Sequence, residues 1–437
     1  MAQGVNATQV FEMLMESQYW HEDQMQDYQR TQLEQLLHHA YKTVPFYAER
    51  LAPMFDTRGQ INWDRWQDVP VFGRAEASLN NDALRSTAHP RHHGRTDKTS
   101  TSGTTGNPVQ VEWSLLTSTV NLACDWRAHT WWSLDWSQVL VRWRKMQIPQ
   151  SLPESLHNHG PWGPRSITAA MAGQQYFADA SRPFEELLQH LRKVSAVYMT
   201  APASMPFEAA QHLLEQQQHI PIKRIIGYGF AFEPEFAPAI SNAFGAKLAN
   251  LYSSTEGGRM AYTCGDHRHY HVNAETVLVE ILDDENRPCP VGVTGRVVIT
   301  ALQNAAQPFI RYDHGDLASW AEGCPCGRRL PTIKSIDGRS YHMFRRRDGK
   351  RFAPAVPDHS RAVLGAEFWQ FSQTSLDTIE VKYKPTTARN AEAEQQFTEM
   401  LRGFLQEDFQ IVFVEVSQLP KTASGKFLKY QNLMDHG

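Results

Sequence analysis

The chain has 437 residues, of which 41% are hydrophobic and 21% are charged. This composition is typical of a folded globular protein and excludes a disordered or fibrous chain. Because 43 basic residues stand against 47 acidic ones, the net charge is −4, and we expect neither nucleic acid nor a membrane surface as a main partner. At about 150 residues per domain, the length predicts about three structural units.

The segment that follows Met1 is polar, and no apolar run of about 18 residues occurs in the chain. The sequence therefore predicts neither a signal peptide nor a membrane span. Its five cysteines have no regular disulfide spacing, and three of them lie among histidines and glycines. Both features favour a cytoplasmic protein in a reducing compartment.

Apolar residues recur at three- and four-residue intervals between residues 10 and 51, which predicts one or two amphipathic helices that end at Val44-Pro45. Pro and Asp interrupt the segment 55–90, and we expect it to loop over the surface. Farther along, short apolar runs alternate with helical patterns, so the sequence predicts an α/β body with a largely parallel sheet. The predicted strands are 139–143, 196–199, 224–227 and 248–252, and the predicted helices are 184–194 and 207–219.

After Glu256 the sequence shows strand patterns without long helices, at 276–282 and 295–301, which indicates a β-rich subdomain. Past Gly338 a further series of elements is long enough to form a small domain of its own. These elements are a basic hairpin at 344–352, a strand at 378–383, a helix at 391–405 and a strand at 411–416.

The segment Thr99-Ser-Thr-Ser-Gly-Thr-Thr-Gly-Asn-Pro108 combines two glycines with six hydroxyl side chains. Glycines let the backbone turn its N–H groups toward an anion, and the hydroxyls add donors, so such a loop can wrap the phosphates of a nucleotide. It lacks the Gly-Lys-Ser/Thr ending of a Walker A loop. On its own, the pattern is equally consistent with a hydroxyl-rich surface turn.

Later motifs favour the nucleotide-binding interpretation. Tyr252-Ser-Ser-Thr-Glu256 follows a predicted strand, and ligands of open α/β sheets gather at the carboxyl ends of strands. Arg311-Tyr-Asp-His-Gly-Asp316 and Asp337-Gly-Arg339 supply an acid and a base. Leu419-Pro-Lys-Thr-Ala-Ser-Gly-Lys426 places a lysine on a glycine-containing loop, where a lone lysine would simply be solvated.

In this order, the motifs resemble those of the acyl-adenylate-forming superfamily, which includes acyl-CoA synthetases, peptide-synthetase adenylation domains and luciferases. The resemblance extends from about residue 30 to the end of the chain. Thr43-Val-Pro-Phe-Tyr47, the segment 264–275 and Cys324-Pro-Cys-Gly-Arg328 are similar to the phenylacetate-coenzyme A ligase branch. The resemblance implies an α/β fold. A large N-terminal domain with mainly parallel sheets and a β-rich subdomain, 1–338, would precede a small mobile α+β domain, 339–437.

The resemblance also implies roles for the matching residues, with Lys426 and Glu256 as the catalytic ones. Glu256 would bind Mg2+, a cation that prefers carboxylate and phosphate oxygens. Asp316 would accept hydrogen bonds from the ribose of ATP, with Arg339 as a second contact. Lys426 would reach the α-phosphate and the substrate carboxylate, where negative charge accumulates. The other nucleotide-binding positions are Ser102, Gly103, Thr104, Thr105 and Gly106 at the phosphates, Phe232, Glu233 and Pro234 on one face of the adenine, Tyr252 on the other face, and Ser253, Ser254 and Thr255 of the same motif.

The implied enzyme is an AMP-forming acid–thiol ligase. It would convert a carboxylic acid and ATP to acyl-AMP and then transfer the acyl group to coenzyme A, while the small domain moves between the two steps. An acyl-AMP ligase that uses an amine, a hydroxyl or a carrier-protein thiol as acceptor would need the same ATP site. A nucleotide- or zinc-binding protein without turnover is a third alternative, against which the presence of both Glu256 and Lys426 argues.

The family name suggests an aromatic or apolar acid as the substrate. A homodimer is a possible assembly of the chain. Tryptophans follow the hydroxyl-rich loop in a segment that borders the acyl pocket in the family, but most of them are expected to fill the core. These tryptophans are Trp126, Trp131, Trp132, Trp136 and Trp143.

The chain departs from the family after Arg339, where acidic residues are usual at the hinge between the domains. Here Tyr341 and His342 occupy this region, so the residues at the expected hinge differ from the family's pattern. The basic hairpin 344–352 replaces a more apolar stretch. Its charges predict a solvated hairpin or, less directly, a contact with the phosphates of coenzyme A.

Cysteines and histidines cluster in two segments, 264–271 and 324–326. Thiolates and imidazoles suit a tetrahedral zinc ion, and four protein ligands would make the site structural rather than catalytic. Cys-x-Cys is tighter than the usual zinc-finger pair, so reduced structural cysteines are the alternative. The candidate ligands are Cys264, His267, His271, Cys324 and Cys326, while His269 is a weaker candidate and Cys124 and Cys289 are expected to be ordinary thiols.

Overall fold

The computed structural model describes residues 6–100, 109–145, 155–164, 172–229, 231–339, 343–348, 351–352, 354, 356, 360–405, 407–418, 420 and 427–434. The chain divides into two compact units. The first unit comprises residues 1–203, 220–231 and 245–336, and the second comprises 204–219, 232–244 and 337–437. The boundary expected at residue 338 stays a prediction.

Two helices open the first unit, as the apolar spacing predicts. Helix α1 (Ala7–Ser17) begins at Asn6, whose side chain accepts a hydrogen bond from the amide of Thr8 and so caps the helix. Helix α2 (Glu22–Thr43) has acidic residues in its first turn and buries five apolar residues of one face. It ends where Val44, in front of Pro45, adopts an extended conformation, and this confirms the predicted end of the helix.

The segment 55–90 is not the surface loop that its Pro and Asp content predicted. It forms the 3-10 helix η3 (Trp63–Asp68) and helix α3 (Arg74–Leu79). Val69, Phe72 and Leu84 are buried, and the ring of Phe72 lies 5.3 Å from that of Tyr312. The prediction was wrong because the apolar residues between the helix-breaking residues anchor the segment in the core. Further short helices of this part are η1 (Pro45–Tyr47), η2 (Ala52–Met54) and η4 (Arg91–His93).

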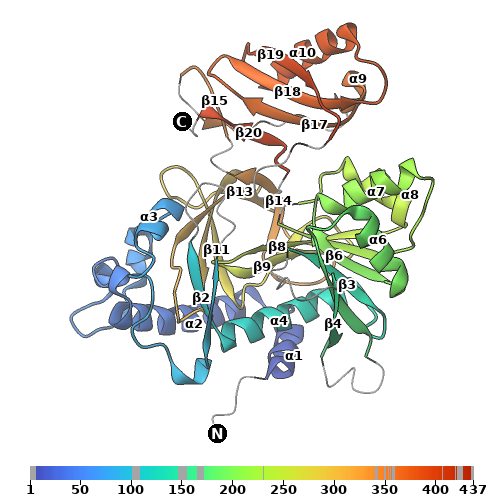
Figure 1. Ribbon diagram of the computed structural model, residues 1–437. Helices are drawn as coiled ribbons and strands as arrows, with labels where there is room; N and C mark the ends of the chain where they lie inside the picture. Colours follow the sequence, from blue (N-terminus) through green and yellow to red (C-terminus); the bar gives the residue numbers. More distant parts are fainter. Residues whose placement is uncertain are drawn as a thin grey trace. The chain divides into compact units, whose positions relative to one another are not determined.

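A sheet of twelve described strands crosses the first unit in the order β11-β12-β13-β14-β10-β9-β8-β7-β6-β3-β5-β4 (Figure 1). Strands β5, β3, β6, β7 and β8 are parallel, and β8 then pairs antiparallel with β9. The expected parallel α/β core and β-rich part thus share one mixed sheet. The strands are β3 (Leu140–Arg144), β4 (Leu156–Pro161), β5 (Gln174–Asp179), β6 (Tyr198–Pro202), β7 (Arg224–Tyr228), β8 (Lys247–Ser254), β9 (Gly258–Thr263), β10 (Tyr270–Val272), β11 (Val277–Leu282), β12 (Thr294–Ala301), β13 (Tyr312–Trp320) and β14 (Thr332–Arg339).

Helix α4 (Leu115–Trp131) packs against this sheet, and α1 lies beside it (Figure 1). The ring of Phe11 of α1 meets Trp126 of α4 edge to face at 6.1 Å. As expected, four of the five tryptophans are core residues, namely Trp126, Trp131, Trp132 and Trp143. Helix α6 (Phe184–Lys193) connects β5 to β6. Among the residues that the structure describes, no helix is long and apolar enough to span a bilayer.

The second unit contains a four-stranded sheet in the order β19-β18-β17-β20. Helix α10 (Ala391–Leu405) buries Phe397, Leu401 and Leu405 in the core beneath this sheet. The predicted basic hairpin is present as two short antiparallel strands. Helices α7 (Met205–Glu215) and α8 (Phe236–Phe244) belong to this unit through Phe207, whose ring lies 4.3 Å from Phe236 and 6.4 Å from Phe368. The other elements are β15 (Phe344–Arg345), β16 (Arg351–Phe352), α9 (Arg361–Leu364), β17 (Ala366–Gln373), β18 (Thr378–Pro385), β19 (Gln410–Glu415) and β20 (Tyr430–Asn432).

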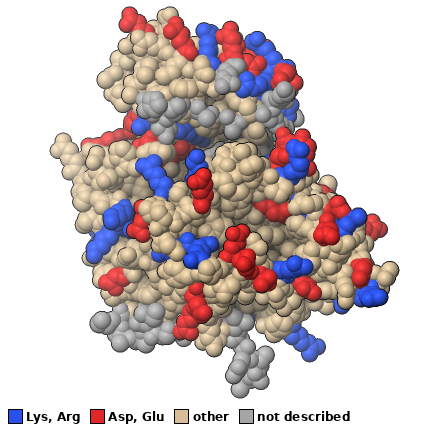
Figure 2. Space-filling view, turned by 180° about the vertical axis from the view of Figure 1, so that it is seen from behind, with Lys and Arg blue, Asp and Glu red and all other residues tan. Residues whose placement is uncertain are grey.

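Basic and acidic side chains lie interspersed on the face that Figure 2 shows. This mixing agrees with the small net charge of −4. In the basic hairpin, for example, Nε of Arg347 lies 2.5 Å from Oδ1 of Asp377.

Candidate active site

The turn between β8 and β9 positions Glu256. Ser254 pairs with Gly258 across the two antiparallel strands, and its hydroxyl accepts a hydrogen bond of 2.8 Å from the amide of Gly257. The indole N–H of Trp113, in strand β2 (Gln110–Ser114), donates to the carbonyl of Thr255 at 2.8 Å. These bonds hold the turn in one conformation.

A close approach makes glycine necessary in this turn. Gly258 has φ +68°, in the left-handed region that disfavours residues with a side chain. A Cβ atom there would also lie 2.6 Å from Oδ1 of Asn121 in α4. The turn can therefore pack tightly against α4.

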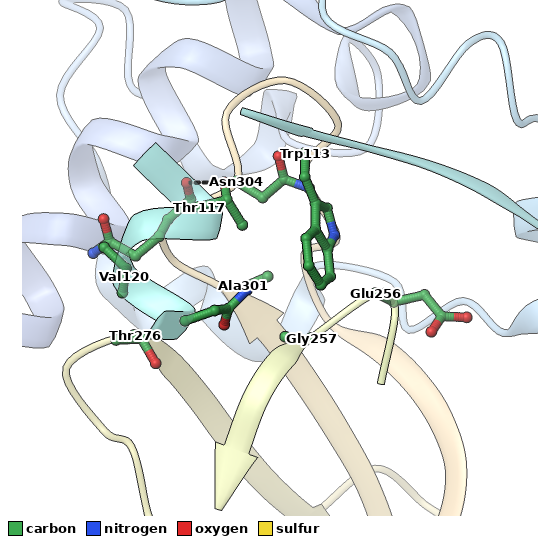
Figure 3. A pocket seen from close by; sticks show the side chains of 11 residues that line it. Trp113, Thr117, Val120, Glu256, Gly257, Thr276, Ala301 and Asn304 are labelled. Carbon is green, nitrogen blue, oxygen red and sulfur yellow. Dashed lines mark hydrogen bonds between the residues drawn. The ribbon is translucent and has the colours of Figure 1, made fainter. Parts of the chain in front are cut away.

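Glu256 itself is buried, with 5% of its surface exposed. The hydroxyl of Tyr312, at the start of β13, donates to Oε1 of Glu256 at 3.2 Å. Figure 3 shows the carboxylate pointing away from Thr117 and Val120 of α4. These two residues line a pocket of about 300 Å³, part of it open to solvent, which Glu256 borders. The carboxylate is thus oriented toward β13 rather than into this pocket.

Asp316 of β13 lies in a second polar cluster. Its Oδ2 accepts a hydrogen bond of 2.8 Å from the hydroxyl of Tyr252 in β8 and lies 2.5 Å from Nδ1 of His314. The rings of Tyr252 and His314 meet edge to face, with centroids 5.8 Å apart. The structure therefore brings together the predicted adenine-binding tyrosine and the predicted ribose-binding acid.

His314 and Tyr312 were missed by the sequence analysis. Side chains two positions apart in a strand point to the same face, so His314 shares the face of Asp316. No strand was predicted for the segment that forms β13, and a strand pattern there would have placed Tyr312, His314 and Asp316 on one face.

The structure leaves several predicted positions outside its description. Strands β1 (Thr96–Ser100) and β2 pair in antiparallel fashion and flank the hydroxyl-rich loop. Phe232, Glu233 and Pro234 belong to the second unit, whereas Tyr252 belongs to the first. The positions outside the described residues are Ser102, Gly103, Thr104, Thr105, Gly106, Tyr341, His342 and Lys426, together with the side chain of Arg339.

Comparison with known proteins relates the fold of this chain to that of enzymes that form acyl adenylates. The structure of 2-hydroxyisobutyryl-CoA ligase in the postadenylation state in complex with R3-HIB-AMP has a TM-score of 0.71 at 18% identity, over 91% of this chain and 87% of the other. The chain has the fold of acyl-adenylate-forming enzymes. This result confirms, at the level of the fold, the resemblance that the motifs indicated.

Two further solved structures share the acyl-adenylate-forming fold. The anthranilate CoA ligase AuaEII in complex with anthranoyl-AMP has a TM-score of 0.51 at 15% identity, over 76% of this chain and 65% of the other. The amide bond synthetase McbA from Marinactinospora thermotolerans has a TM-score of 0.50 at 14% identity, over 74% and 66%. No family model matches the chain, and no curated protein matches it.

A cysteine–histidine cluster lies elsewhere in the first unit. The ligand atoms of Cys264, His271, Cys324 and Cys326 all lie within 4.8 Å of one another. His271 is in β10, the partner of β14, and its Nε2 lies 3.3 Å from Sγ of Cys326. His267, the fifth predicted ligand, is exposed and is not part of this group.

The donor set fits a zinc ion. Zn–S and Zn–N bonds of about 2.3 and 2.05 Å put a sulfur and a nitrogen ligand of one tetrahedral ion roughly 3.6 Å apart, close to the separation between His271 and Cys326. Burial lowers the pKa of His271 to about 4, which keeps the imidazole neutral, as a ligand must be. Burial raises the pKa of Cys324 to about 12, and a bound cation would be needed to deprotonate this thiol.

The cluster is tied to α4 and to the end of α1. The ring of His271 lies 5.3 Å from that of Trp131, whose indole N–H donates to Oε1 of Gln18 at 2.7 Å. The amide of Arg329 donates to the carbonyl of Gln18 at 2.8 Å. A metal there would therefore fasten the segment 324–329 to the end of α1.

Proposed function

We propose that the chain activates a carboxylic acid with ATP as acyl-AMP and transfers the acyl group to coenzyme A. The observation that supports this function best is the placement of Asp316 and Glu256 by two tyrosines, Tyr252 and Tyr312, which link β8 to β13. The two acids are those that the motifs assign to the ribose and to Mg2+. The shared fold with two CoA ligases supports the same function.

In this proposal, the first unit holds the nucleotide. Asp316, oriented by Tyr252 and His314, accepts hydrogen bonds from the ribose, with Arg339 as a second contact. Glu256 holds Mg2+, and the carboxylate bound to Tyr312 is a ligand type that this cation prefers. When bound, Mg2+ neutralises charge on the phosphates of ATP. The loop 102–106 holds the β- and γ-phosphates, and the motifs assign Phe232, Glu233, Pro234 and Tyr252 to the adenine.

The chemistry proceeds in two substitutions. A carboxylate oxygen of the acid attacks the α-phosphorus of ATP, and pyrophosphate leaves with the electrons of the broken P–O bond. Lys426 contributes a positive charge where the carboxylate and the α-phosphate meet. In the second step, the thiol of coenzyme A loses its proton and attacks the acyl carbonyl, and AMP leaves. The small domain moves between these steps.

The acyl acceptor in the second step has an alternative to coenzyme A. The fold is shared with an amide bond synthetase as well as with CoA ligases, so an amine, a hydroxyl or a carrier-protein thiol is the alternative acceptor. The motifs similar to the phenylacetate-CoA ligase branch favour coenzyme A and an acid whose body is aromatic or apolar. The proposal also includes a structural zinc ion bound by Cys264, His271, Cys324 and Cys326.

Carboxylate-dependent exchange between ATP and pyrophosphate tests adenylation. Pools of aromatic, aliphatic and amino acids are assayed with the wild type and with Lys426→Ala, and the active pool is then assayed with coenzyme A. We expect exchange that the substitution abolishes, followed by thioester formation. Exchange without a thioester would favour the alternative acceptors. Failure of the protein to bind ATP would overturn the proposed function.

A further inference from the structure

A charged cluster lies between α4 and the large sheet of the first unit. Asp125 and His129 come from α4, Arg142 from β3, and Arg259 and Tyr262 from β9. Asn121, one turn before Asp125, accepts a hydrogen bond of 3.0 Å from the amide of Arg259. Arg259 comes three residues after Glu256 in the sequence. The cluster is therefore linked through the backbone to the proposed metal-binding acid.

The carboxylate of Asp125 is fully engaged by its neighbours. Arg259 donates to both of its oxygens, from Nε to Oδ1 at 3.0 Å and from Nη2 to Oδ2 at 3.3 Å. The hydroxyl of Tyr262 donates to Oδ1 at 2.5 Å. Burial alone would raise the pKa of Asp125, but Arg259 and Arg142 lower it, so the group is a carboxylate. Its single negative charge is matched by the guanidinium of Arg259.

Arg142 has no such partner among the described residues. Its Nε donates to the amide oxygen of Gln175 at 3.1 Å, and no described carboxylate lies within ion-pair distance of it. The side chain is half-buried, and burial lowers its pKa. By contrast, the fully buried Arg127 makes two hydrogen bonds to the carboxylate of Glu275. A half-buried guanidinium without a counter-ion is costly, because partial desolvation weakens its hydration.

The other titratable groups around Arg142 do not balance its charge. Burial lowers the pKa of His129 to about 3 and raises that of Tyr228 to about 12, so both are neutral near pH 7. Tyr262 is protonated as well, since burial raises its pKa. The described cluster thus holds two positive charges and one negative charge, and the excess resides on Arg142.

Arg142 lies near the end of its strand at which ligands of open sheets gather. It lies on β3, whose carboxyl end is at Arg144, in the parallel part of the sheet. Tyr228, the last residue of β7, donates from its hydroxyl to the carbonyl of Trp143 at 2.8 Å and so brings the ends of β7 and β3 together. Ligands of such sheets bind beyond the carboxyl ends of the strands.

We propose that Arg142 binds a second carboxylate of the acid substrate, so that the enzyme selects dicarboxylic acids over monocarboxylic acids of the same size. This inference rests on the proposed adenylation and specifies its substrate class. One carboxylate of the acid would attack ATP, and the other would form a charge-assisted pair with the planar guanidinium, for which arginine is better suited than lysine. The body between the two carboxylates can remain aromatic or apolar.

Exchange kinetics with matched acids test the proposal. The pairs are terephthalate with p-toluate, glutarate with pentanoate, and adipate with hexanoate, assayed with wild type, Arg142→Met, Arg142→Lys and Arg192→Met. Arg192 is exposed on α6 and serves as the control for the same chemical change. In at least one pair, we expect the dicarboxylate to have the higher kcat/KM. Arg142→Met should lower this value by about 30-fold or more, as expected for loss of a buried charge partner.

The kinetic results can overturn the role of Arg142 without overturning the proposed adenylation. The monocarboxylate should be unaffected by Arg142→Met, and Arg142→Lys should give an intermediate loss for the dicarboxylate. Exchange that favours the monocarboxylate in every pair, or an equal loss for both acids of a pair, would overturn the inference while adenylation stands. Circular dichroism and thermal melting establish that each variant is folded.

A second measurement does not depend on turnover. Sodium sulfate and sodium chloride are compared at equal ionic strength in thermal melting of the full chain, with sulfate as the dianion probe. We expect sulfate to raise the melting temperature of the wild type and of Arg192→Met more than that of Arg142→Met. Equal rises in all three would contradict an anion site at Arg142. A smaller rise for Arg142→Met, with no exchange from any of the six acids, would support the anion site and count against adenylation of these acids.

Discussion

Tyr312 donates a hydrogen bond of 3.2 Å to Oε1 of Glu256 and thereby joins the start of β13 to the turn between β8 and β9. Four residues farther along β13, Asp316 accepts the hydroxyl of Tyr252, which lies four residues before Glu256. One tyrosine thus donates from β8 to β13, and the other donates from β13 to the turn that follows β8. Each orients one of the acids on which the proposed function depends, so loosening either link should change nucleotide binding rather than folding alone.

Tyr312→Phe tests the link to Glu256. Removal of the hydroxyl leaves a buried carboxylate without this donor, and a hydrogen bond to a charged group contributes about 1.5–3 kcal/mol. We expect the apparent affinity for Mg2+ in the exchange assay to fall by about tenfold, since 1.4 kcal/mol corresponds to one factor of ten. The measurement is the Mg2+ dependence of exchange at saturating ATP.

Tyr19→Phe provides the control, because Tyr19 is 53% exposed and lies outside the site. It should leave the Mg2+ dependence unchanged. If Tyr312→Phe shifted the melting temperature but not the Mg2+ dependence, the hydrogen bond would be structural only.

Much of the first unit could be predicted from local patterns. The spacing of Leu33, Leu36, Leu37 and Ala40 predicts the buried face of α2, and Val44-Pro45 predicts its end. The joining of β8 to β9 in one mixed sheet could not be predicted, because strand order depends on pairings between distant segments. Local rules also failed for 55–90, where packing of Phe72 outweighs the turn-forming residues.

The candidate site divides in the same way. Motifs identified Glu256 and Asp316 because their residue types and order are specific, while their partners Tyr312 and His314 depend on strand register. The cysteine–histidine chemistry was also visible in the sequence. The choice between His267 and His271 was not, since it depends on β10, in which His271 pairs with Thr332 of β14.

Substitution of two histidines distinguishes the ligand from its neighbour. His271→Asn should lose the metal, because it removes one of four donors, whereas the exposed His267→Asn should keep it. We expect about one zinc ion per chain in the wild type, as for a closed four-ligand site. Mass spectrometry of the metal content measures this directly. If His271→Asn retained zinc, or if His267→Asn lost it, the assignment of His271 as the zinc ligand would be wrong.

Breaking the ion pair between Arg127 and Glu275 should strongly destabilise the first unit. Nη1 of Arg127 lies 2.6 Å from Oε1 of Glu275, and both side chains are fully buried. Glu275→Gln leaves a buried guanidinium without its charge partner, which costs about 3–5 kcal/mol. Urea unfolding measures the loss as a lower midpoint. Asp68→Asn removes an exposed partner of Arg65 and should leave the midpoint unchanged. Equal effects of the two substitutions would show that burial of the pair does not determine its importance.

His129 should make stability depend on pH in the acid range. Burial lowers the pKa of His129 to about 3; Asp125 raises it in part, and Arg142 lowers it further. A histidine with its ordinary pKa of about 6.5 takes up a proton in the unfolded chain but not in the fold, so its contribution is complete above that pH and is lost as the pH falls toward 3. The slope for one such group is about 1.4 kcal/mol per pH unit.

Urea unfolding of wild type and His129→Gln at several values between pH 7 and pH 4 measures this contribution. The variant should lose less stability than the wild type as the pH falls, by about 1 kcal/mol for each unit below pH 6. His212→Gln, which changes a histidine of α7, should follow the wild-type curve. Parallel curves for wild type and His129→Gln would mean that His129 accepts a proton within the fold. Its positive charge would then add to that of Arg142, and the charge balance of the cluster would favour an anion even more strongly.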